Sequence, residues 1–240
     1  MFKYISTLIL CLLAVPYLTF AQLSERATPP SFQYQFAQKP PVLTMPNIDV
    51  ARLMAEDEED LKFNNPLRFA FGHKVKLNLN NAGIWESLPN GDRVWRLQIK
   101  CPDALNINFL YSDFYLPEGG QLFIYNKDKS QVLGAFTSRN NKDSRRFATA
   151  LINDEIATLE YYEPRQVKGQ SSIEIAQIGH GYRDMDGRAS HEGAEAGACQ
   201  VNVNCSPEGD NWQDEKKGVA KIIMDGLYLC SGSLIILVHG

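Results

Sequence analysis

Trp95-Arg-Leu-Gln-Ile-Lys100 and, a few residues on, Leu105-Asn-Ile-Asn-Phe-Leu-Tyr111 are the stretches that decide the fold of this chain. In both, apolar and polar residues alternate, the pattern of a β-strand with one buried face. Similar short runs follow, separated by Gly, Pro and Asn turn signals, and no helical pattern lies between them. The sequence is therefore predicted to be mostly β, with an antiparallel β-sandwich over residues 67–180. Its further strands are expected at 121–126, 132–137, 147–151, 156–162 and 173–178.

The region before the sandwich, residues 22–66, is predicted to be an extended leader with one short helix. Two proline pairs, at 29–30 and 40–41, favour extended chain. A helix is expected over residues 49–63, capped by Asp49, with an apolar side formed by Val50, Leu53, Met54 and Leu61. The acidic run 56–60 is interpreted as a solvated helix face and not as a calcium site.

The first 21 residues read as a secretory signal peptide. Lys3 is followed by an apolar run to Phe20, and cleavage is expected after Ala21. The mature chain is therefore expected to be secreted, extracellular or periplasmic, and free of the membrane once the signal is removed. The net charge of −4 comes without a basic stripe, which argues against a nucleic-acid partner, and no cofactor is expected.

Four cysteines remain after Cys11 leaves with the signal: Cys101, Cys199, Cys205 and Cys230. In an oxidising compartment four thiols allow three complete pairings, among which the sequence does not choose. Zinc is the alternative, but the Cys-x5-Cys spacing without a further Cys or His pair is a poor metal signature.

Residues 181–198 are predicted to be an exposed linker, because they are polar and rich in small residues. Arg183 and Arg188 are suitable processing sites in it, and the bond after Arg188 is preferred. Asp184 and Asp186 only faintly resemble a calcium loop. His180 and His191 have no partner at metal-ligand spacing.

Four elements of the C-terminal segment carry a resemblance: Gly197-Ala198-Cys199, Val203-Asn204-Cys205, Pro207-Glu208-Gly209-Asp210 and Cys230-Ser-Gly-Ser-Leu-Ile235. Together they resemble the start of the bacterial lysyl endopeptidases, secreted serine proteases with a trypsin-like double β-barrel. The resemblance implies that residues 199–240 hold the first strands of that barrel and that the sandwich is a propeptide domain. A strand at 218–224, an Asp225-Gly226 hairpin turn and a return strand at 227–235 fit this prediction.

The same resemblance implies that Cys199, Cys205 and Cys230 pair with cysteines further along a longer chain. Cys101, outside the resemblance, is expected to be a buried free thiol. The catalytic His, Asp and Ser are expected beyond position 240, so no catalytic residue is assigned here. His239 lacks the Thr-Ala-x-His-Cys context, and Ser233 lacks a base partner.

The chain is thus expected to be a truncated precursor of an endopeptidase that acts on proteins or peptides, with the prodomain contacting its own protease domain. No Lys lies between Lys168 and Lys216, so a Lys-specific enzyme does not cut its own linker. Two alternatives stay open at this point. One is a prodomain-like inhibitor or chaperone of a protease on another chain. The other is a non-enzymatic sandwich that binds carbohydrate or protein through Tyr111, Tyr115, Tyr161 and Tyr162.

Overall fold

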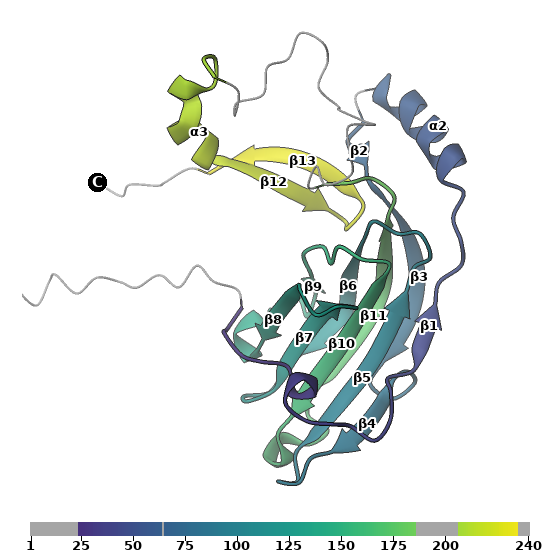
Figure 1. Cartoon of the computed structure of the whole chain (residues 1–240), viewed down its shortest axis with the longest axis vertical. Coiled ribbons are helices and arrows are strands. Elements are labelled where there is room, and N and C mark those ends of the chain that lie inside the picture. Colours follow the sequence, from purple (N-terminus) through teal and green to yellow (C-terminus); the bar gives the residue numbers. More distant parts are fainter. Residues whose placement is uncertain (1–23, 64, 186–205, 235–240) are drawn as a thin grey trace, which may run out of the picture.

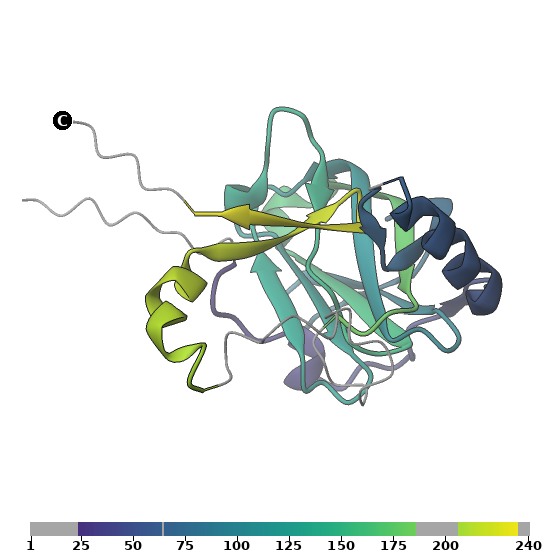
Figure 2. The ribbon, with the colours of Figure 1, turned by 90° about the horizontal axis from the view of Figure 1, so that it is seen from above.

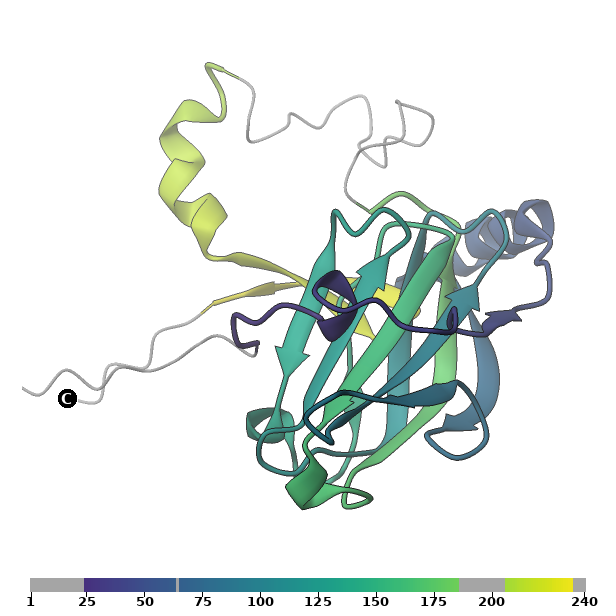
Figure 3. The same cartoon turned by 60° about the horizontal axis from the view of Figure 1, so that its bottom comes forward.

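The structure, a computed structural model, describes residues 24–63, 65–185 and 206–234. It is mostly β, as predicted, and two sheets pack face to face in the body of the molecule (Figures 1 and 3). One sheet has the strand order β1-β5-β10-β7-β8, with β4 paired to β5, and the other has the order β3-β11-β6-β9. The strands are β1 (Val42–Thr44), β3 (Ala70–Asn78), β4 (Ile84–Ser87), β5 (Arg93–Lys100), β6 (Asn106–Tyr115), β7 (Gln121–Asn126), β8 (Val132–Phe136), β9 (Phe147–Ala148), β10 (Ile156–Glu163) and β11 (Ser172–Gly181).

The apolar alternation seen in the sequence forms the core between these sheets. Trp95, Leu97 and Ile99 of β5 and the inward residues of β6 are almost completely buried in this core. All seven predicted strand positions are occupied by strands, and only the expected strand at 147–151 is much shorter than predicted. The predicted antiparallel sandwich is therefore confirmed, with one exception in its pairing: β1 runs parallel to β5.

The helix α2 (Val50–Leu61) lies where the sequence predicts it, and Asp49 caps it by accepting a hydrogen bond from the Arg52 N–H at 3.0 Å. Its burial differs from the prediction. Leu53 is buried, whereas Met54 and Leu61 are exposed. Asp57, in the acidic run interpreted as a solvated face, is only 2% exposed. That interpretation is wrong for Asp57, because basic side chains from distant parts of the chain surround it.

Short helical elements complete the description: the 3₁₀ turns η1 (Pro30–Phe32), η2 (Ser138–Asn140), η3 (Arg165–Val167) and η4 (Asp210–Trp212), and the helix α3 (Gln213–Lys217). Within the described residues no helix is both long enough and apolar enough to span a bilayer.

A third, small sheet contains the C-terminal segment. β12 (Val219–Met224) and β13 (Tyr228–Ser233) form an antiparallel hairpin, and β13 also pairs with β2 (Leu67–Arg68). This hairpin crosses the top of the sandwich, and β2 lies between it and α2 (Figures 1 and 2). The chain around β2 therefore connects the hairpin to the sandwich.

Candidate functional site: the seat of the C-terminal hairpin

The hairpin turn forms where the sequence predicts it, at Asp225-Gly226. Their φ angles are 51° and 70°, and the Leu227 N–H donates to the Met224 carbonyl at 3.0 Å. Two successive positive φ values are those of a type I′ turn, which the twist of an antiparallel hairpin favours, and Asp-Gly is one of its preferred sequences. The loop is one residue longer than the two predicted, because the strands pair Met224 with Tyr228 and the return strand begins there, not at Leu227. The turn places the carbonyl groups of Asp225 and Gly226 at the narrow tip of the hairpin, where Gly226 is buried.

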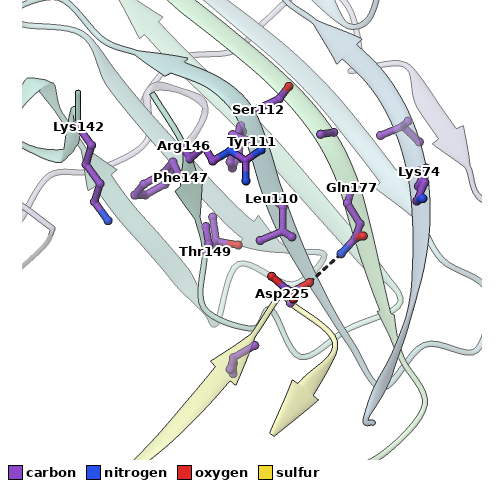
Figure 4. A pocket seen from close by; sticks show the side chains of 15 residues that line it. Lys74, Leu110, Tyr111, Ser112, Lys142, Arg146, Phe147, Thr149, Gln177 and Asp225 are labelled. Carbon is purple, nitrogen blue, oxygen red and sulfur yellow. Dashed lines mark hydrogen bonds between the residues drawn. The ribbon is translucent and has the colours of Figure 1, made fainter. Parts of the chain in front are cut away.

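That tip is bound by polar side chains on the outer face of the four-stranded sheet. The Asn108 amide of β6 donates to the Gly226 carbonyl at 2.9 Å. The Gln177 amide of β11 donates to the Asp225 carbonyl at 2.9 Å (Figure 4). A Cβ atom at Gly226 would lie 2.6 Å from the Asn108 Oδ1. The close approach therefore requires glycine at the tip for a second reason besides its φ angle.

Backbone pairing extends the contact from the tip along the return strand. Tyr228 and Leu229 are in register with Arg68 and Leu67 of β2, and the Phe69 N–H donates to the Leu227 carbonyl at 2.9 Å. Strand addition of this kind gives affinity through main-chain hydrogen bonds. We call these contacts of the tip and of residues 227–229 the hairpin seat.

Behind the seat, the carboxylate of Asp57 holds β2 in place. It accepts hydrogen bonds from the Arg68 Nε at 2.7 Å, the Arg183 guanidinium at 2.9 Å and the Tyr182 hydroxyl at 2.8 Å. Arg68 also donates to the Leu53 carbonyl and to the carboxylate of Glu56. The carboxylate thus joins α2, β2 and the residues that follow β11.

The charges in this cluster stabilise one another. Burial lowers the pKa of the Arg68 guanidinium, but its hydrogen bonds to Glu56 and Asp57 outweigh burial, and the net shift of the pKa is upward. Burial and the hydrogen bond to Asp57 both raise the pKa of the Tyr182 hydroxyl. The guanidinium groups of Arg68 and Arg183 are therefore held in place by charge-assisted hydrogen bonds to Asp57.

Arg183 is held by the same cluster. Its guanidinium donates to Asp57 and to the Arg68 carbonyl, and its own carbonyl accepts from the Asn106 amide at 3.1 Å. The sequence placed Arg183 in an exposed linker as a suitable processing site. Because a protease needs mobile backbone at the bond it cuts, these contacts make Arg183 a poor one.

A groove of about 720 Å³ opens beside the tip, between the hairpin and the outer face of the four-stranded sheet. Its floor includes Val75, Leu110 and Ala148, and Ile223 and Asp225 of the hairpin form one side. Figure 4 shows Lys74 at one end of the groove and Lys142 at the other. No local pattern in the sequence predicts this groove, because it exists only where the hairpin meets the sheet.

Of the predicted disulfide candidates, Cys230 lies in β13, exposed and unbridged. Its disulfide stays a prediction, and Cys199, Cys205 and the processing candidates Ala21 and Arg188 fall outside the described residues. Cys101 is buried and free, as predicted, and burial raises the pKa of its thiol to about 12.

The tyrosines proposed for a binding face do not form one. Tyr111 and Tyr161 are 3% and 0% exposed, with their rings in the sandwich core, and only Tyr115 is substantially exposed. The prediction that they are exposed is wrong for Tyr111 and Tyr161, because the alternation of each strand directs these rings inward.

His180, to which the sequence assigned no partner, lies against His73, a residue that sequence reasoning missed. The two rings approach to 3.4 Å between ring nitrogens, and both side chains are buried. Burial, and then the charge of His73, lowers the pKa of His180 to about 4, and burial lowers the pKa of His73. In the described part of the chain no group of three or more His, Cys, Asp or Glu residues converges as a metal site does.

The geometry defines a β-sandwich that binds the tip and one strand of a C-terminal hairpin. In a comparison with known protein families, residues 193–236, which include the hairpin, match the model of the lysyl endopeptidase C-terminal domain. The segment that occupies the seat, from α3 through β13, is thus similar to part of a protease domain. Endopeptidases act on proteins, so the match relates this end of the chain to an enzyme with protein substrates.

Proposed function

We propose that this chain is the N-terminal part of the precursor of a secreted trypsin-like serine endopeptidase. In this proposal residues 67–180 are the prodomain and residues 199–240 begin the protease domain. The observation that carries it is the hairpin seat, where the protease-like hairpin is bound by Asn108 and Gln177 of the sandwich. Contacts of this kind are what a prodomain needs in order to hold its own protease domain.

The reaction of the complete enzyme would be acyl transfer, with serine as nucleophile, histidine as base, and aspartate orienting the histidine. The described residues give no such arrangement to Ser233, whose hydroxyl lies at the end of β13 without a histidine hydrogen bond. We expect the three catalytic residues beyond position 240. The sandwich and its bound hairpin would then be the inactive part of the precursor.

In the proposal the prodomain has a physical task during folding. An isolated two-stranded hairpin is marginally stable in water, and the exposed tip and edge of this one need partners. The seat supplies them through β2 and the amides of Asn108 and Gln177. We propose that the sandwich stabilises the first hairpin of the barrel before later strands complete it.

Release of the protease domain would require a cut between the sandwich and Cys199. We propose Arg188-Ala189 as that bond and residues 1–21 as the export signal. The hydrogen bond of Arg183 to Asp57 supports this choice, because it holds Arg183 in place and makes the bond after it a poorer substrate for a protease. Limited trypsin digestion of the folded chain should cut after Arg188 first. A first cut after Arg183 would show that the Asp57 cluster does not protect it.

Two measurements test the proposed function. Purified chain incubated with a Lys or Arg amide substrate should release no product above buffer, and hydrolysis would contradict the absence of the catalytic residues. The coding sequence downstream of position 240 should continue in frame through a Thr-Ala-x-His-Cys motif. An intergenic stretch there would overturn the precursor proposal.

A further inference from the structure

The groove beside the hairpin tip is built on one row of residues across the four-stranded sheet. Lys74 of β3 pairs with Gln177 of β11, which pairs with Leu110 of β6, which pairs with Ala148 of β9. All four line the groove. Three steps between neighbouring strands make the row about 14 Å long, which is the length of about four residues of extended chain.

Both ends of this row carry positive charge. Lys74 stands at the β3 end, and Arg146 and Lys142 stand at the β9 end (Figure 4). Across residues 24–63, 65–185 and 206–234, none of these three side chains forms an ion pair with a carboxylate. Among the described residues that line the groove, only Asp225 is acidic. The groove is therefore cationic on a chain whose net charge is −4.

The middle of the groove is apolar. Leu110 and Ala148 form part of the row, and Val75 and Ile223 line it beside them. A small anion such as phosphate would meet one end of the groove and leave this floor exposed to water. A ligand that fits the whole groove needs an apolar group at its centre and an anionic group at each end.

We propose that the groove binds an extended acidic peptide segment with the pattern Asp/Glu-x-apolar-x-Asp/Glu. In an extended chain the first, third and fifth residues face the same side, and the first and fifth are about 14 Å apart. One carboxylate then faces Lys74, the other faces Arg146, and the apolar side chain covers Leu110. The proposal depends on charge and register, and it stands whether or not the chain is a protease precursor.

The groove is continuous with the hairpin seat, so a bound peptide contacts both partners of that interface. Ile223 and Asp225 belong to the hairpin, whereas Lys74 and Leu110 belong to the sandwich. If the peptide and the hairpin both bind the same conformation of the sandwich, each of them favours the binding of the other. Peptide binding is therefore expected to slow hydrogen exchange at the Phe69 amide, which donates to Leu227 of the hairpin.

The test uses the 240-residue chain and two fluorescent peptides of equal composition. The first contains Asp-Ser-Leu-Ser-Asp and the second Asp-Asp-Leu-Ser-Ser, and anisotropy measures their affinity at low and high salt. Lys74→Glu and Arg146→Glu each reverse one charged end of the groove. Lys76→Glu is the matched control, because Lys76 is exposed on the same strand but does not line the groove.

The first peptide should bind about ten-fold more tightly than the second, and high salt should weaken it. Lys74→Glu and Arg146→Glu should each weaken it about ten-fold, whereas Lys76→Glu leaves its affinity unchanged. Circular dichroism of each variant establishes that it is folded. Absence of binding to the wild-type chain, equal affinity for both peptides, or displacement by phosphate at the peptide's own concentration would overturn the proposal.

Discussion

Replacing Asp57 by asparagine removes the one negative charge shared by Arg68 and Arg183, while keeping the shape of the side chain. The carboxylate is 2% exposed and accepts three hydrogen bonds of 2.7–2.9 Å. Loss of one partner of a buried ion pair costs about 3–5 kcal/mol. The two arginine side chains keep 17% and 20% of their exposure, and Arg68 keeps Glu56. We therefore expect a smaller loss, about 2–3 kcal/mol of the free energy of unfolding.

Urea denaturation followed by tryptophan fluorescence measures this loss of free energy. In thermal unfolding, the Tm should fall by about 5–10 °C. Asp214→Asn is the matched control, because it removes an acidic side chain whose ion pair with Lys217 is highly exposed. That control should change the stability by less than about 0.5 kcal/mol. Equal stabilities of Asp57→Asn and the wild type would refute the reasoning that this carboxylate holds the cluster together.

Two further predictions concern the cysteines and the histidine pair. Iodoacetamide should label Cys230, which is exposed, and leave Cys101 unlabelled until the chain unfolds, because burial raises the pKa of the Cys101 thiol to about 12. Peptide mass mapping reports the labelling of both cysteines. Labelling of Cys101 in the native chain would contradict its burial. The pKa of His180 is lowered from 6.5 to about 4, so the unfolded chain binds the extra proton between these values. Stability should be fully present above pH 6.5 and fall by up to about 3 kcal/mol as the pH approaches 4, and urea titrations of the wild type and His180→Gln should differ in this slope. Equal slopes would exclude His180 as its source.

The sandwich is predictable from the sequence because its strands alternate strictly. In β5, Trp95, Leu97 and Ile99 point into the core, and the period of two is visible in a short window. β3 carries the same kind of signal, because Val75, Leu77 and Leu79 alternate with Lys74, Lys76 and Asn78. It was nevertheless not predicted, and its register shifts where it faces β11. The bulge at that point has no counterpart in the local pattern of the sequence.

The hairpin seat is not predictable in this way, because its parts are far apart in the sequence. Asn108 occupies a polar position of an alternating strand, where a side chain ordinarily faces solvent. It is nevertheless buried, and its amide donates to the carbonyl of Gly226, which lies 118 residues further along the chain. Asp57 is buried by Arg183 from 126 residues away. The Asp225-Gly226 turn itself was predicted, since a type I′ turn depends on two adjacent residues. Local chemistry predicted the hairpin, and long-range contacts decide where it docks.

The docking of the hairpin on the sandwich is tested most directly by hydrogen exchange at the Phe69 amide, in the wild type and in Gly226→Val. The Phe69 N–H donates to Leu227 of the hairpin, and the variant places a side chain against Asn108 at the tip. The Ile107 amide, which donates to Ile152 inside the sandwich, serves as the internal reference. We predict slow exchange at both amides in the wild type and fast exchange at Phe69 alone in the variant. Fast exchange at Phe69 in the wild type, or slow exchange in both proteins, would contradict a hairpin held by its seat.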